Sequence, residues 1–286
     1  MANYYKHSGK FSPHGPIMGL FGGIAVSVPA AFLYNFAIFS VPGAKARFLC
    51  TIVFGLLLGG VCGAMMCLGK VRSKLVAGIV AFASSLAGLY VSWLAWILHL
   101  MYPSHWVLNI IPAALRPLQF WKAVLAVNLS GTWGFAGGTP VHGAALWLVW
   151  AGEALLVLGF GVLGAVALVQ KRPFCERCEQ WCTKSKLYFA PALPCEDFKI
   201  QLESGDVSEL EKLPSGNKKQ AHYRIDLHTC GVCQQLNTVS LEQSFPRPKV
   251  VVNKLILTPE QASVIRNIEM NQRAASTTSA IPASAK

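Results

Sequence analysis

The stretch from Ala165 to Cys178 reads AVALVQKRPFCERC, and it divides the chain into two parts of different chemistry. Up to residue 170 the sequence holds nine Lys or Arg and one acidic residue, whereas the rest holds sixteen and twelve. The 286 residues are 53% hydrophobic and only 13% charged, too little charge for the surface of one soluble domain. These values predict a membrane region followed by a water-soluble domain, and they exclude a disordered chain, collagen or a disulfide-stapled mini-protein.

Four apolar segments of the first part are long enough to cross a membrane, because a helix needs about 20 apolar residues to span the hydrocarbon core. The predicted spans run from about Ile17 to Val41, Phe48 to Gly69, Leu75 to Tyr102 and Gly143 to Val169. Between the last two, Arg116, Lys122 and prolines favour an interfacial or re-entrant segment, followed by a glycine-rich loop over 130–143. The sequence therefore predicts an all-α, four-helix transmembrane bundle over residues 1–170.

Basic residues in the short loops predict the orientation of this bundle. Lys and Arg near a span resist translocation, so the side that carries more of them stays in the cytoplasm. The side of the chain ends carries seven and the other side four, namely Lys6, Lys10, Lys70, Arg72, Lys74, Lys171 and Arg172 against Lys45, Arg47, Arg116 and Lys122. We therefore expect both termini in the cytoplasm, with a bacterial inner membrane as the default location. A cleaved secretory signal is the competing interpretation, but its apolar region would be longer than the roughly 7–15 residues that are typical.

Glycines recur at every fourth position in and beside the first two predicted spans. They are Gly15, Gly19 and Gly23 in the first and Gly55, Gly59 and Gly63 in the second. Small residues on one helix face let two helices approach closely in lipid, where no hydrophobic force drives association. Packing within the bundle is the favoured interpretation, and homo-oligomerisation is the alternative.

Glu153 is the one ionisable residue well inside a predicted span. A carboxylate at this depth is costly unless it is protonated or paired, which makes it a functional candidate. No partner is evident in the sequence, because His99 and His142 lie near span ends and could reach Glu153 only if the fourth helix began later than Gly143. The structural interpretation is a protonated Glu153 hydrogen-bonded to a neighbouring helix, and the functional one is a group that handles protons or cations.

Two Cys-x-x-Cys pairs carry the clearest chemistry of the soluble half. Cys175 and Cys178 follow the last span, and Cys230 and Cys233 lie in the sequence HTCGVC. Each pair closes a turn that presents two thiolates about 2.3 Å from a metal, and two turns supply the four ligands of tetrahedral Zn²⁺. Gly231 suits the sharp turn of the second pair. From Cys175 to about Glu242 the chain resembles a zinc ribbon, and the resemblance implies a structural metal site rather than an activity.

The spacing of the two pairs departs from a minimal two-knuckle site. They are separated by 51 residues instead of roughly 15–20, so residues 183–229 are expected to fold as an insertion. Alternating apolar residues predict strands over 222–228, 236–242 and 250–257, and Thr258 is the expected N-cap of a helix. The sequence thus predicts a small α+β zinc-ribbon-like domain over 171–273 and a disordered tail over 274–286.

Other uses of these cysteines stay open at this point. Disulfides are disfavoured in a reducing cytoplasm, and neither pair sits in the strand-to-helix context of a thioredoxin-like motif. Iron accepts the same four thiolates, and Cys182 or Cys195 is a possible substitute ligand. Nucleic acid is not an expected partner, because the soluble half has a net charge of only +4, from sixteen basic and twelve acidic residues.

Three functions are compatible with these features. The first is a membrane-anchored interaction or regulatory protein, whose zinc-ribbon-like domain binds a protein partner at the cytoplasmic face. The second is a small transporter, channel or intramembrane enzyme that uses Glu153. The third is a cytoplasmic thiol sensor that releases zinc on oxidation. The sequence carries no familiar hydrolase or NTPase motif, so no catalytic residue is predicted and a non-enzymatic role is favoured.

Overall fold

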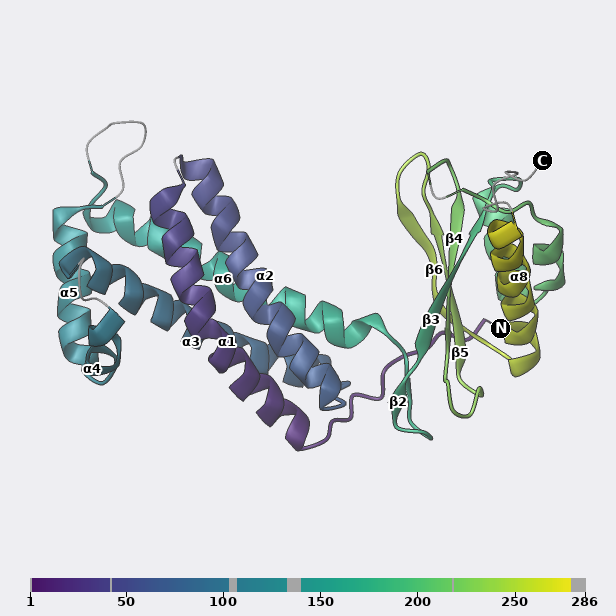
Figure 1. The fold of residues 1–286 in the computed structure, drawn as a ribbon, viewed down its shortest axis with the longest axis horizontal. Helices are drawn as coiled ribbons and strands as arrows, with labels where there is room; N and C mark the ends of the chain where they lie inside the picture. Colours follow the sequence, from purple (N-terminus) through teal and green to yellow (C-terminus); the bar gives the residue numbers. More distant parts are fainter. Residues whose placement is uncertain (1, 42, 103–106, 133–139, 218, 279–286) are drawn as a thin grey trace, which may run out of the picture. The chain divides into compact units, whose positions relative to one another are not determined.

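The computed structural model describes residues 2–41, 43–102, 107–132, 140–217 and 219–278 (Figure 1). These residues form two compact units. One extends from Ser8 to Lys171 and is helical. The other combines the N-terminal residues up to His7 with the chain from Arg172 onward, and it is built on a β-sheet.

The helical unit contains four helices that are long and apolar enough to cross a membrane. They are α1 (His14–Ser40), α2 (Ala44–Leu68), α3 (Lys74–Met101) and α6 (Gly143–Lys171). The shortest has 25 residues and a length of about 37 Å at 1.5 Å per residue, more than the roughly 30 Å of a hydrocarbon core. Each predicted span is therefore one helix, and the four helices indicate an integral membrane protein.

Glycines let these helices approach one another within the chain. A Cβ atom added to Gly59 of α2 would lie 1.9 Å from the carbonyl oxygen of Gly161 of α6, and one added to Gly23 of α1 would lie 2.6 Å from Oγ of Ser84 on α3. Large apolar side chains such as Leu33, Leu148 and Leu155 point outward instead. The two glycine stripes thus pack inside the bundle, which is the interpretation that the sequence favoured.

Short helices connect α3 to α6. They are η1 (Val107–Asn109), α4 (Ile110–Ala114) and α5 (Pro117–Ser130), with Pro117 at the start of α5. With 14 residues, α5 is only about 21 Å long, too short to cross a bilayer. Residues 133–139 of the expected glycine-rich loop lie outside the described residues.

The second unit is a four-stranded antiparallel sheet with a small hairpin before it. The hairpin consists of β1 (Phe174–Cys175) and β2 (Gln180–Trp181), and the sheet has the order β3 (Thr183–Phe189), β4 (Tyr223–Thr229), β5 (Asn237–Gln243), β6 (Lys249–Leu257). The three predicted strands are confirmed as β4, β5 and β6. The strand β3 and the helix α7 (Cys195–Ser204) lie in the expected insertion and were not predicted individually.

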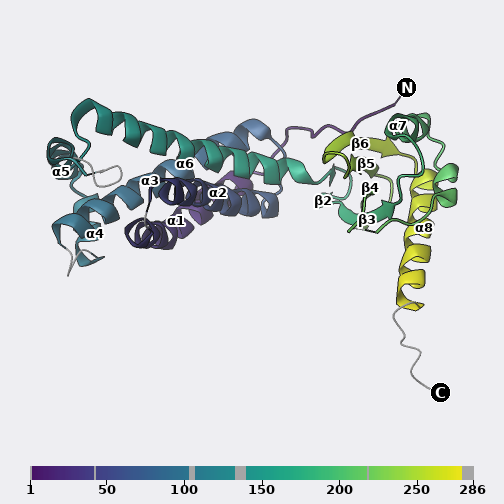
Figure 2. The ribbon, with the colours of Figure 1, turned by 90° about the horizontal axis from the view of Figure 1, so that it is seen from above.

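Helices cover one face of this sheet. The strands direct Leu187, Ile225, Val239 and other apolar residues to a core that also contains Phe198 of α7 and Ile265 of α8 (Pro259–Thr278). The short helix η2 (Ser208–Lys212) adds Leu210 to this core. Figure 1 shows α8 beside the sheet, and in Figure 2 the end of the helix extends past the strands. The period-2 alternation of the strands decides which residues face this core.

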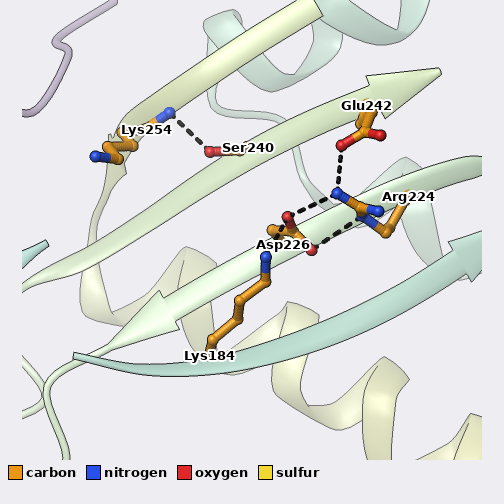
Figure 3. Close-up of polar contacts among 6 residues, drawn as sticks. All are labelled: Lys184, Arg224, Asp226, Ser240, Glu242 and Lys254. Carbon is orange, nitrogen blue, oxygen red and sulfur yellow. Dashed lines mark hydrogen bonds and ion pairs between the residues drawn. The ribbon is translucent and has the colours of Figure 1, made fainter. Parts of the chain in front are cut away.

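Charged residues tie the strands together on the opposite face (Figure 3). Nζ of Lys184 on β3 lies 2.6 Å from a carboxylate oxygen of Asp226 on β4, and the guanidinium of Arg224 contacts both Asp226 and Glu242 of β5. The backbone N–H of Lys254 donates to Oγ of Ser240 (2.9 Å), where the register of β5 and β6 shifts. These contacts stabilise the order of the strands.

The helix α8 begins as predicted and ends later. Oγ1 of Thr258 accepts from the N–H of Gln261, whose side chain accepts from the N–H of Thr258, which is a capping box. The helix continues to Thr278, beyond residue 274, where the tail was expected to begin. Two alanines in this segment favour the helix. Residues 279–286 lie outside the described residues.

Residues near the N-terminus belong to the sheet unit and not to the membrane region predicted over residues 1–170. Tyr4 pairs with Leu255 of β6, the N–H of Tyr5 donates to the carbonyl of Lys254 (2.9 Å), and the N–H of Ile256 donates to the carbonyl of Asn3 (2.8 Å). A segment of three residues has no detectable period, so only the partner strand reveals it.

Candidate metal centre

The pairing of β3 with β4 explains how two distant cysteine pairs meet. Thr183 at the start of β3 lies opposite Thr229 at the end of β4. The chain that precedes β3 and the chain that follows β4 therefore lie at the same end of the sheet. Cys175 and Cys178 come from the first of these segments, and Cys230 and Cys233 come from the second. The long separation in sequence does not prevent a common site, because the insertion begins and ends in neighbouring strands.

The four cysteines form one compact cluster. All their sulfur atoms lie within 4.8 Å of one another, and the Sγ atoms of Cys175 and Cys233 are 3.7 Å apart. In a tetrahedral site with Zn–S bonds of about 2.3 Å, two sulfurs are separated by about 3.8 Å. A disulfide would instead require about 2.05 Å, and all nine cysteines are free thiols. The cluster has the dimensions of a tetrathiolate site and could hold a metal ion.

Two turns present these thiols. In the first, β1 and β2 pair with Cys175 opposite Gln180, and Glu179 adopts a positive φ of 50°. In the second, the N–H of Gln234 donates to the carbonyl of Cys230 (3.1 Å), and Gln234 adopts a φ of 53°. Gly231 lies in this turn, as predicted, but the residue with left-handed backbone geometry is Gln234.

Backbone and helix contacts hold both turns in place. The N–H of Cys182 donates to the carbonyl of Pro173 (2.9 Å), which closes the first turn. The N–H of Cys230 donates to the carbonyl of Leu236 (3.0 Å) across the second. The guanidinium of Arg266, on α8, donates to Oε1 of Gln234 (2.9 Å). The second turn is thus fixed to the helix that covers the sheet.

The N-terminal segment supports the first turn. The hydroxyl of Tyr5 accepts from the backbone N–H of Phe174 (2.9 Å) and donates to its carbonyl (3.2 Å). Phe174 packs edge-on against Trp181 with ring centroids 5.0 Å apart, and the ring of His7 lies 6.2 Å from Trp181. Tyr5 and His7 therefore stabilise the hairpin that carries Cys175 and Cys178 by direct contact. No sequence signal marked this contact.

The environment of the thiols favours a thiolate at one position. The backbone N–H of Gln235 donates to the sulfur of Cys233 and lowers the pKa of Cys233 to about 6. Hydrogen bonding to Cys233 raises the pKa of Cys178 to about 12. The neighbouring thiols therefore act as hydrogen-bond donors to the sulfur of Cys233.

The two spare cysteines are not members of the cluster. Cys182 is buried against it, and burial raises the pKa of Cys182 to about 12, which keeps this thiol protonated. Cys195 begins α7 and packs against the core of the sheet unit. The structure therefore brings together the four cysteines of the predicted pairs without these two.

Glu153 lies in the helical unit and has a partner that the sequence did not reveal. The hydroxyl of Tyr34, on α1, donates to Oε1 of Glu153, and the same hydroxyl lies 3.0 Å from Oγ1 of Thr51 on α2. The ring of His99 lies against that of Phe39, with centroids 4.4 Å apart and planes tilted by 39°. A tyrosine is not distinguished in the sequence from the other aromatic residues of the spans, so only the packing of three helices identifies it.

Comparison with protein-family models, with curated proteins and with solved structures finds no match to this chain. No family is recognised, and the metal-binding assignment depends on the four cysteines and their geometry.

Proposed function

We propose that this protein anchors a zinc-ribbon-like domain in a membrane. In this proposal Cys175, Cys178, Cys230 and Cys233 bind one structural Zn²⁺, and the domain serves at the cytoplasmic face for interaction with a protein partner or for regulation. The observation that carries the proposal is the approach of four thiols from two distant turns to within 4.8 Å of one another.

The donor set supports a structural zinc site. Zn²⁺ in structural sites is four-coordinate and takes all its ligands from the protein, whereas catalytic zinc keeps an open position. Four thiolates fill the tetrahedron, and two of the cysteines are buried and two are partly buried. Iron accepts the same donors but gives strong visible absorption, so colour distinguishes the two metals.

The organisation of the chain supports a location of both termini on the same side of the membrane. Four crossings return the chain to the side on which it began, and the N-terminal residues are part of the sheet unit. Together with the seven basic residues on this side, these facts support a cytoplasmic position for the domain. A fluorescent protein fused after Lys286 should therefore be bright in cells, and alkaline phosphatase fused there should be inactive.

Metal analysis of cysteine variants tests the proposed role. The intact protein, purified without chelator, should contain one zinc per chain. Cys230→Ser should lose the metal, because it removes a ligand, and its sheet unit should be cut faster by protease. Cys195→Ser is the matched control and should keep both metal and resistance, since Cys195 lies outside the cluster. A Cys230→Ser protein with full zinc and unchanged proteolysis would contradict the proposal.

A further inference from the structure

A small cavity lies inside the helical unit, next to Glu153. It has a volume of about 30 Å³ and is lined by residues of α1, α3 and α6. Polar groups come from Tyr34, Asn35, Ser92 and Glu153, and most of the remaining wall is aromatic. Since one enclosed water occupies roughly 10–15 Å³ on this scale, the cavity holds a ligand of about two non-hydrogen atoms.

The carboxylate of Glu153 is fixed at the edge of this cavity. Tyr34 donates its hydroxyl hydrogen to Oε1 of Glu153 and is itself buried, with 7% of its surface exposed. Oε2 of the carboxylate is not engaged in this bond and remains an acceptor. The described residues that line the cavity include no Lys, Arg or His. Because the described wall offers no cation, the ionised form of Glu153 is favourable here only together with a positively charged ligand.

The neighbouring amide and hydroxyl groups offer acceptors to such a ligand. Asn35 donates both of its amide hydrogens, to the carbonyls of Ala31 (2.9 Å) and Ser92 (3.0 Å), so its side chain can offer only its carbonyl oxygen. The hydroxyl of Ser92 donates to the carbonyl of Leu89 (2.8 Å) and keeps only lone pairs for a ligand. Asn35 and Ser92 are 4% and 2% exposed, so both are held within the bundle.

Three tryptophans complete the wall. Trp93 and Trp150 meet edge to face with ring centroids 4.8 Å apart, and Trp96 lies 6.1 Å from Trp93 and 6.4 Å from Trp150. The face of an indole ring attracts a cation, and the attraction is stronger where water is excluded. Hydrogen-bond acceptors, a carboxylate without a cationic neighbour in the described wall, and an aromatic lining together suit a cation that also carries N–H donors.

We propose that this cavity binds a small protonated amine, either ammonium or the –NH₃⁺ group of a methylammonium-sized molecule. The N–H groups donate to Glu153, Asn35 and Ser92, and the tryptophan rings surround the charge. A quaternary ammonium has no N–H donor and more non-hydrogen atoms than the cavity holds, so it is excluded. This site is independent of the cysteine cluster, which belongs to the other unit.

Calorimetric titration of the full-length protein in zwitterionic nanodiscs tests this proposal. Ammonium chloride and methylammonium chloride should each bind saturably above a sodium chloride reference of equal ionic strength, and tetramethylammonium chloride should not. Tryptophan fluorescence should change along the same binding curve, because three of the eight tryptophans line the cavity. No saturable binding of either amine, or equal binding of tetramethylammonium, overturns the proposal.

Single substitutions distinguish amine binding in this cavity from a general effect on the protein. Glu153→Gln keeps the shape of the side chain and should weaken amine binding at least tenfold, since it removes the charge. Ser92→Ala removes one acceptor and should weaken amine binding several-fold. This variant replaces Glu153→Gln in the test if Glu153→Gln is unstable. Trp121→Phe, on α5 and half exposed, should leave the affinity unchanged. Unchanged affinity in both Glu153→Gln and Ser92→Ala contradicts the assignment.

Discussion

Adjacent glycines of α2 should respond in opposite ways to substitution by alanine. A Cβ atom on Gly59 would lie 1.9 Å from the carbonyl oxygen and 2.7 Å from the carbonyl carbon of Gly161, whereas a Cβ on Gly60 would meet nothing within 4 Å. Ordinary van der Waals contacts of a Cβ begin near 3.4 Å. Gly59→Ala therefore forces α2 and α6 apart, because the obstructing atoms belong to the backbone and cannot rotate away.

The magnitude follows from two effects. Both substitutions gain about 1 kcal/mol of helix propensity, so this gain cancels when the variants are compared. Overpacking costs about 1–3 kcal/mol, and the upper end applies where backbone meets backbone. Gly59→Ala should thus be less stable than Gly60→Ala by about 3 kcal/mol, with the wild-type protein between them.

Unfolding of the purified protein in mixed micelles of increasing SDS content measures this difference. Circular dichroism should report the loss of helix packing at a lower SDS fraction for Gly59→Ala and at a slightly higher one for Gly60→Ala. Gly60→Ala is the matched control, since it makes the same chemical change one residue away. If the two variants unfold within about 0.5 kcal/mol of each other, α2 and α6 do not cross at Gly59.

Three further substitutions test the sheet unit. Tyr5→Phe should speed the transfer of zinc to a chelator several-fold, because it removes the hydroxyl that bonds both backbone groups of Phe174. Asp226→Asn should speed hydrogen exchange in β4 by lowering the free energy of opening by about 1–3 kcal/mol, since this carboxylate pairs with two cations and is only 10% exposed. Thr258→Ala should destabilise the first turn of α8 by about 1 kcal/mol, as measured by exchange of its amides.

Each of these substitutions has a control elsewhere in the unit. Tyr4→Phe removes a hydroxyl that bonds Glu203 at the surface, so it should leave zinc transfer unchanged. Asp197→Asn, on the exposed side of α7, should not alter exchange in β4. Ser263→Ala, one turn into α8, should affect the helix less than Thr258→Ala. Equal effects of a variant and its control would show that the contact in question contributes nothing specific.

Patterns of apolar residues within single segments made most of the architecture predictable. The four membrane helices follow from uncharged runs longer than a bilayer is thick, and β4, β5 and β6 follow from alternation of apolar residues. The strand β3 was missed because its first half, Thr183 to Lys186, is polar and gives no alternation with the core. The helix α7 was missed because it is short and buries only Phe198 and Leu202, too few apolar residues to establish a helical period.

The candidate site was predictable in its residues but not in its support. Two Cys-x-x-Cys pairs suffice to name the four cysteines, because tight turns place both thiols of a pair on one metal. The approach of the two cysteine pairs depends on the register of β3 and β4, which cannot be predicted from the sequence pattern. Tyr5, Gln234 and the pairing of Tyr34 with Glu153 depend on tertiary contacts between distant segments, so local patterns carry no sign of them.

X-ray absorption at the zinc edge of the full-length protein tests the central claim most directly. We predict a single shell of four sulfur atoms at about 2.3 Å, from one zinc ion per chain. A shell that contains nitrogen or oxygen in place of sulfur, or a protein that carries no zinc and has these cysteines paired as disulfides, would contradict it.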